Sequence, residues 1–198
     1  MLDVDFGTFP FVTSSNTISA GVCTGLGVAP QRIRDVIGVS KAYCTRVGSG
    51  PFPTELEDAT GEELRKIGHE YGATTGRPRR CGWIDGVALK FACMINGVTK
   101  IVMTKADVLD AFPELKVCTD YSVNGEKTNE IPFQMNRLHI QPLLRSFPGW
   151  GTDTTAVKKY DQLPEKMKEY VQFINNYLGV KIAYISNGPG REQLIEND

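Results

Sequence analysis

The sequence predicts an α/β protein with a largely parallel sheet, flanking helices and an inserted β-hairpin. Apolar runs at 98–103 and 180–185 each follow a segment with helical spacing of apolar residues, which is typical of parallel strands joined by helices. Asn124-Gly125, within 115–131, is a strong hairpin turn signal. The chain has 198 residues. At about 150 residues per domain, this length predicts one domain or part of a larger one.

The N-terminal part predicts a strand, a loop and then a helix. Residues 1–28 mix short apolar runs with small polar residues and have no helical period, so we expect a strand followed by a loop. Pro30 suits the first turn of a helix, and Val36 and Ile37 continue an apolar spacing of three and four. We therefore expect a helix from Pro30 to about Tyr43.

Two further helices are predicted around a polar segment. After a glycine-rich connection at 45–51, Thr60 and Glu63 form a capping-box signature for a helix that Gly72 should end. A more apolar helix should follow the polar segment 73–80. Its apolar residues are Trp83, Val87, Phe91 and Met94.

The C-terminal half predicts two buried strands and a helix. The run 98–103 is apolar throughout, as in a strand buried on both faces. The last helix should begin near Leu163-Pro164 and end at Gly179, directly before the strand 180–185. That helix should bury Met167, Val171, Ile174 and Leu178.

Charge and composition exclude several classes of protein. The 22 basic and 23 acidic residues give a net charge of -1, too little positive charge for nonspecific nucleic-acid binding. No stretch approaches the ~20 apolar residues of a membrane span, and the acidic start is unlike a signal peptide. We therefore expect a cytoplasmic protein with no nucleic-acid or membrane partner. The five cysteines have no CxxC spacing and the two histidines no ligand spacing, so we expect reduced thiols and no metal site in this chain.

Two loops follow predicted parallel strands, where α/β proteins commonly bind ligands. In Thr104-Lys105-Ala106-Asp107, the carboxylate could accept from the N1–H and N2 amine of guanine, a donor pair that adenine lacks. Two such charge-assisted bonds could favour guanine by roughly a hundredfold. The other interpretation is a solvated lysine and a helix-capping aspartate. Ser186-Asn187-Gly188-Pro189 could close on the base carbonyl or form an ordinary turn.

The segment from Ala73 to Arg80 is a candidate anion receptor. Its threonines, Gly76 and three arginines (Arg77, Arg79, Arg80) combine hydroxyls, close backbone approach and guanidinium forks that pair with carboxylate or phosphate. The alternative is a solvated run of charge. No nucleophile, base and orienting residue can be assembled elsewhere, and no phosphate-binding glycine motif occurs.

Several longer motifs carry a resemblance to a known family. They are Val12-Thr13-Ser14-Ser15-Asn16-Thr17, Lys41-Ala42-Tyr43, Thr45-Arg46-Val47-Gly48, Gly50-Pro51-Phe52-Pro53-Thr54-Glu55, Ala73-Thr74-Thr75-Gly76-Arg77, Thr104-Lys105-Ala106-Asp107, Pro148-Gly149-Trp150 and Ser186-Asn187-Gly188-Pro189. In this order the chain resembles the C-terminal part of adenylosuccinate synthetase, a little under half of that family's usual length. The resemblance covers essentially residues 1–198.

The resemblance implies a P-loop-NTPase-like fold, incomplete in this chain, and a ligase of purine biosynthesis. Such an enzyme joins IMP to L-aspartate with GTP hydrolysis, through 6-phosphoryl-IMP, and leads to AMP. It also implies Mg²⁺, GTP as co-substrate, a cytoplasmic location and a homodimer.

Site residues follow from the resemblance, motif by motif. IMP would contact Leu2, Thr13, Val47 and Arg77. The aspartate loop would comprise Ala73, Thr74, Thr75, Gly76, Arg77, Pro78 and Arg79, although Pro78 stands where relatives often have a basic residue. GTP would contact Arg79, Lys105, Ala106, Asp107, Ser186, Asn187 and Gly188.

The family's phosphate loop, catalytic aspartate and catalytic histidine would all precede Met1. No catalytic residue or Mg²⁺ ligand is therefore assigned to this chain, and we expect a fragment that is inactive alone. The alternatives are a guanine-nucleotide-binding module without catalysis and a purely structural piece. Apolar surface that a missing half would cover should be exposed.

Overall fold

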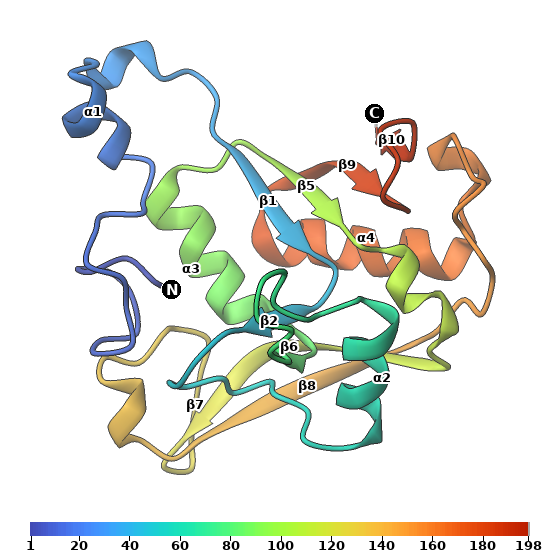
Figure 1. Cartoon of the computed structure of the whole chain (residues 1–198), viewed down its shortest axis with the longest axis horizontal. Coiled ribbons are helices and arrows are strands. Elements are labelled where there is room, and N and C mark those ends of the chain that lie inside the picture. The colour runs from blue at the N-terminus through green and yellow to red at the C-terminus, as the bar shows by residue number, and fades with distance from the viewer. Residues whose placement is uncertain (198) are drawn as a thin grey trace.

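A computed structural model describes residues 1–197, and it contains two main sheets with helices between them (Figure 1). The first sheet has the order β1-β5-β9-β10. Its first three strands are parallel, and only β10 runs antiparallel to β9. The predicted largely parallel sheet is therefore confirmed. The strands are β1 (Ile37–Lys41), β5 (Lys100–Thr104), β9 (Lys181–Ser186) and β10 (Leu194–Glu196).

The predicted hairpin belongs to a second sheet, where β6 pairs with three strands. It forms the hairpin with β7 around Asn124-Gly125, as expected, and it pairs parallel with β4. It also pairs along its length with β8, which the sequence does not predict. This sheet comprises β4 (Ile84–Asp85), β6 (Glu114–Val123), β7 (Glu126–Thr128) and β8 (Ile140–Pro148), and a small separate sheet comprises β2 (Cys44–Arg46) and β3 (Arg80–Gly82).

Helices α3 and α4 lie between the two main sheets, because α4 contacts both β9 and β8 while α3 contacts β6 and α4 (Figure 1). Helix α2 packs on β3, and α1 lies at the upper left end of Figure 1. None of the helices in residues 1–197 has the length and apolar character needed to cross a membrane. The helices are α1 (Gly21–Leu26), α2 (Ala59–Ile67), α3 (Gly86–Asn96) and α4 (Glu165–Leu178), with short 3-10 turns η1 (Pro30–Arg32), η2 (Asp107–Ala111), η3 (Met135–Arg137) and η4 (Tyr160–Gln162).

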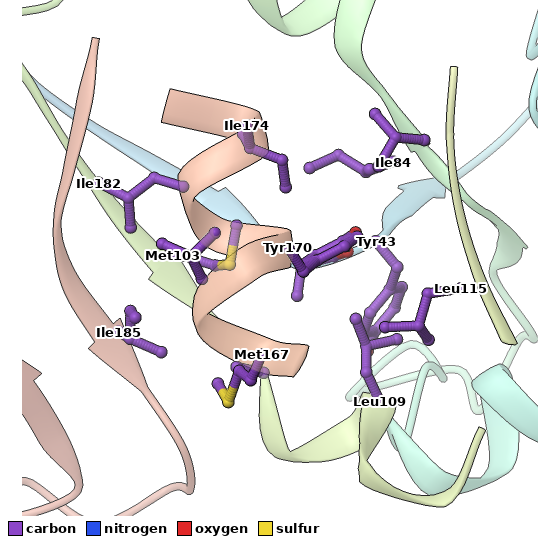
Figure 2. Close-up of a cluster of buried hydrophobic side chains, with 14 of the residues drawn as sticks. Tyr43, Ile84, Met103, Leu109, Leu115, Met167, Tyr170, Ile174, Ile182 and Ile185 are labelled. Carbon is purple, nitrogen blue, oxygen red and sulfur yellow. The ribbon is translucent and has the colours of Figure 1, made fainter. Parts of the chain in front are cut away.

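Helix α4 is the centre of the hydrophobic core (Figure 2). Ile182 and Ile185 of β9 lie on one side of it, and Tyr43 and Leu115 lie on the other. Full burial of an aliphatic side chain such as Ile182, Ile185 or Leu115 contributes about 1.5–3 kcal/mol. The four residues expected to face inward from this helix are all buried: Met167, Val171, Ile174 and Leu178.

The helix predicted from Pro30 to Tyr43 is wrong. Only the 3-10 turn Pro30–Arg32 forms there, and Ile37–Lys41 is strand β1, paired with β5. β-Branched residues such as Ile37 and Val39 favour an extended chain, and the pairing with a distant strand overrides the local apolar spacing. The strand expected within residues 1–28 is also absent. Asp3 instead accepts four backbone N–H bonds that fold this segment into turns.

Three other boundaries differ from expectation. Helix α2 is capped by Asp58, whose carboxylate accepts from Thr60 N and Gly61 N, so the Thr60 capping box does not form. The same helix ends at Ile67, before the expected Gly72, and a side chain at its C-cap Gly68 would overlap the Tyr43 hydroxyl. Helix α3 starts only after Trp83, which is buried before β4. Strand β5 is buried on one face and only half-buried on the other, so the expected burial on both faces is wrong for one of them.

Candidate functional site

The two loops predicted to meet at one end of the sheet do meet there. Strands β5 and β9 are parallel neighbours, and the backbone N–H of Ala106 donates to the carbonyl of Ser186 at 3.1 Å. Loops 105–107 and 186–188 therefore form one continuous edge beyond the carboxyl ends of the two strands. Guanine binding by this edge stays a prediction.

Lys105 differs from the solvated lysine of the alternative interpretation, whereas the capping role for Asp107 stays open. Asp107 is half-buried, and burial raises the pKa of its carboxyl. Lys105 has a left-handed backbone (φ 60°) and its ammonium donates to the Gly68 carbonyl at 2.7 Å. The lysine stem is thus held against the end of α2, while the backbone N–H groups of Asp107 and Val108, at the start of η2, favour the charged form of the Asp107 carboxyl.

Hydrogen bonds within the turn 186–188 and to the segment 154–157 hold this turn in place. Asn187 is buried, and its amide nitrogen donates to the carbonyls of Thr154 and Val157, while its Oδ1 is buried without a partner in residues 1–197. Thr154 in turn donates to the carboxylate of Asp110 through its backbone N–H at 2.7 Å. The Ser186 hydroxyl donates to the Gly188 carbonyl at 2.9 Å. These contacts make the turn a fixed surface.

The candidate aspartate loop is a small, exposed hairpin. Residues 73–78 are exposed, and Gly76 takes a left-handed conformation (φ 64°) with its N–H donating to the Gly72 carbonyl at 2.8 Å. The Arg77 N–H donates to the Thr75 hydroxyl at 3.3 Å. The loop therefore presents hydroxyls and the exposed Arg77, whereas Pro78 forms a bridge with Tyr71 at its base.

The three arginines do not act together. Arg79 donates to Glu70 Oε2 at 2.6 Å. Arg80 pairs with both carboxylate oxygens of Glu55 and also donates to the backbone carbonyls of the glycine-rich connection. The expectation of three guanidiniums in one anion receptor is therefore wrong for Arg80, which holds the scaffold.

A cavity of about 560 Å³ is lined by two of the four predicted IMP-binding residues. Leu2 and Val47 both line it, together with Lys41 of β1. Thr13 lies next to this wall, since its N–H donates to the Leu2 carbonyl at 2.8 Å. Arg77 is not among the lining residues and lies in the loop 73–78.

Sequence reasoning missed two buried carboxylates beside these features. Glu70 accepts from Lys41, Tyr43 and Arg79. Asp85 lines the cavity, accepts from Tyr121 OH at 2.6 Å, and caps α3. Burial raises the pKa of Asp85. The sequence offered one signal for each of them: Glu70 shortly precedes the basic segment 73–80, and Asp85 directly precedes the apolar helix α3.

Metal ligands are not gathered in this part of the chain. Within residues 1–197, no three histidine, cysteine or acidic side chains lie close enough together to hold a metal ion. The described residues therefore do not fit a Mg²⁺ site.

The fold and the site define an α/β protein with paired ligand-type loops at the carboxyl ends of adjacent parallel strands and a basic loop beside a cavity. A sequence model of adenylosuccinate synthetase matches residues 1–195. The chain belongs to the adenylosuccinate synthetase family.

Individual relatives agree with this assignment. The chain is 55% identical to an adenylosuccinate synthetase of Bacteroides fragilis and 57% identical to one of Azobacteroides pseudotrichonymphae, each over 98% of this chain and 46% of the relative. The chain thus spans about half the length of these relatives.

Solved structures agree as well. A fully ligated adenylosuccinate synthetase from Plasmodium falciparum matches with a TM-score of 0.95 and 41% identity, over 100% of this chain and 48% of that one. This match confirms the expected P-loop-NTPase-like fold, of which the chain covers a part. A cyanophage S-2L succinoaminodeoxyadenylate synthetase has a TM-score of 0.59 at 17% identity and shares the fold.

Proposed function

We propose that this chain is the substrate-holding part of an enzyme that joins IMP to L-aspartate with hydrolysis of GTP to GDP and phosphate. The product is adenylosuccinate, on the branch of purine biosynthesis that leads to AMP. In the proposal, the enzyme is a cytoplasmic homodimer, residues 1–198 are its C-terminal portion, and the catalytic groups and Mg²⁺ ligands belong to a part of the enzyme outside these residues.

One observation carries the proposal: the hydrogen bond between Ala106 and Ser186, which joins two loops at adjacent strand ends. In the proposal, Asp107 accepts from the N1–H and N2 amine of guanine, and the Lys105 stem lies along the base. Ser186, Asn187 and Gly188 close on the base carbonyl.

The remaining substrates have separate places in the proposal. IMP lies in the 560 Å³ cavity against Leu2 and Val47, near Thr13, and reaches Arg77. L-Aspartate is held by the loop Ala73, Thr74, Thr75, Gly76, Arg77, Pro78 and Arg79, and Arg79 also reaches the GTP phosphates. Hydroxyls and guanidinium groups are suited to carboxylates.

Calorimetric titration of the chain with GDP and ADP tests the guanine pocket. We expect GDP to bind roughly a hundredfold more tightly. Asp107→Asn should lower this preference by about tenfold, because an amide offers one acceptor and places a donor against guanine. The exposed Asp35→Asn is the matched control and should leave the preference unchanged. Equal or absent heats for both nucleotides would refute the pocket.

A second candidate, a guanine-nucleotide-binding module without catalysis, is favoured by the bracing of turn 186–188 through Asn187 and Thr154 within this chain. Under either proposal the purified chain binds GDP but forms no adenylosuccinate. Adenylosuccinate formation from IMP, L-aspartate and GTP by the chain alone would contradict both.

A further inference from the structure

Glu70 lies behind the candidate site and is held by three donors from two segments, the end of β1 and the base of the loop 73–78. Its side chain is fully buried, directly after α2. Lys41 Nζ, Tyr43 OH and Arg79 Nη1 each donate to it at 2.6 Å. The backbone of Glu70 also accepts from the Arg79 N–H at 2.9 Å. Four hydrogen bonds therefore fix this residue relative to β1 and to the base of the loop 73–78.

The two cations on Glu70 each keep a solvent-facing side. Lys41 lines the 560 Å³ cavity and its side chain is 27% exposed, while the Arg79 side chain at the base of the loop is 34% exposed. Two positive charges on one carboxylate leave a net charge of +1. Lys41 uses two of its three ammonium N–H groups, on Glu70 and on Thr45 Oγ1, and Arg79 uses one of its five guanidinium N–H groups on Glu70, so each keeps donors for a ligand anion while attached to Glu70.

The strand-end edge is attached to the same segment. Lys105 donates to the carbonyl of Gly68, two residues before Glu70. Gly68 has no space for a side chain, because a Cβ there would overlap the Tyr43 hydroxyl. The segment 68–70 is thus packed tightly and is contacted by residues from the cavity wall, the basic loop and the strand-end loop.

We propose that Glu70 is a positioning residue that holds Lys41 and Arg79 in one arrangement and so couples ligand binding in the cavity to ligand binding at the loop. The inference rests on the proposed function, with IMP in the cavity and L-aspartate at the loop. In the proposal Glu70 restricts Arg79 without removing all motion of its partly exposed guanidinium, and a ligand that further restricts Lys41 also further restricts Glu70 and Arg79, so the second ligand has less motion left to remove. By linkage, each ligand strengthens the other by the same factor.

The test measures L-aspartate affinity with and without saturating IMP in the wild-type chain and in Glu70→Gln. We expect IMP to strengthen L-aspartate binding about fivefold or more in the wild type, at the low end of typical coupling. The ratio of L-aspartate affinities with and without IMP should fall to near one in Glu70→Gln. Glu55→Gln is the matched control, since it removes the carboxylate from the neighbouring Arg80 pair and should keep the coupling.

A ligand-free measurement covers the case in which Glu70→Gln does not fold. Rotation of the Arg79 guanidinium in the wild-type chain, followed by ¹⁵N NMR, should be slow compared with that of exposed Arg77. A freely rotating Arg79, or the same IMP effect in wild type and Glu70→Gln, would overturn the role of Glu70. Failure of the wild type to bind IMP and L-aspartate would instead overturn the proposed function.

Discussion

The contribution of Glu70 to folding stability should depend on pH in one direction. Hydrogen bonds from Lys41, Tyr43 and Arg79 outweigh the opposing effect of burial and lower the pKa of Glu70 to about 2, against 4.5 for an ordinary glutamate. A carboxyl group whose pKa is lowered by folding contributes its full stabilisation at pH values above its pKa in the unfolded chain. The stabilisation is lost as pH falls toward the folded value. The sensitive window therefore runs from about pH 5 down to about pH 2.

The magnitude follows from the same contacts. A pKa difference of about 2.5 corresponds to about 3 kcal/mol as an upper limit. Lys41 and Arg79 are partly exposed, at 27% and 34%, and solvent screens part of their attraction. We therefore expect about 2 kcal/mol, of which more than half should be lost by about pH 3.

Urea unfolding of the wild type and of Glu70→Gln at several pH values between 6 and 3 measures this contribution. The glutamine does not titrate, and titration of the other carboxylates largely cancels in the difference. The free-energy gap between the two proteins should narrow as the pH falls. Tyr43→Phe removes one neutral donor and should shift the narrowing to higher pH. A gap that is constant, or that widens on acidification, would refute the reasoning.

Three other perturbations test the ligand loop, the core and the buried carboxyl beside the cavity. Arg77→Leu should weaken binding of IMP and L-aspartate together in calorimetric titrations, and an effect on GDP alone would show that its role is misassigned. Ile174→Ala should lower the urea-derived unfolding free energy by about 2–5 kcal/mol, whereas Ile37→Ala, at a side chain 55% exposed, should change it far less. Tyr121→Phe should lower stability by about 1–3 kcal/mol and further raise the pKa of Asp85 in a ¹³C NMR titration; an unchanged titration would contradict their hydrogen bond.

The elements that the sequence predicts well have local signals that agree with each other. Helix α4 follows Pro164, carries apolar residues at helical spacing, and ends at Gly179, whose φ of 68° suits glycine. Strand β9 then begins almost at once, with no room for another element. The strand-end loops could be placed together because they follow β5 and β9, and parallel strands share their carboxyl edge.

The incorrect prediction of a helix from Pro30 to Tyr43 has a different physical origin. Val36, Ile37 and Val39 fit a helical spacing, yet Val36 bonds with Thr99, 63 residues away, and Ile37 and Val39 pair with β5. Pairing with a distant strand decides their conformation. Two apolar side chains of the edge strand β1 are exposed: Ile37 is 55% exposed and Val39 73%. That a further part of the enzyme covers them stays a prediction.

The hydrogen bonds around Glu70 could not be predicted from the sequence for the same reason. Its donors Lys41, Tyr43 and Arg79 are 29, 27 and 9 residues away, so no local spacing marks them as a group. The Asp85 contact with Tyr121 spans 36 residues. Local patterns place the loops that offer ligand groups, whereas the residues that fix those groups come from whichever segments the fold brings behind them.

The basic loop shows how the fold divides a charge cluster that looks uniform in the sequence. β3 begins at Arg80, and successive side chains of an extended chain point to opposite sides. Arg80 consequently reaches Glu55 and the glycine-rich connection, while Arg79 reaches Glu70 and Arg77 stays exposed in the loop. Two arginines, Arg77 and Arg79, are left for a ligand, and Glu70 already orients Arg79. That number matches the two carboxylates of L-aspartate, the ligand proposed for this loop.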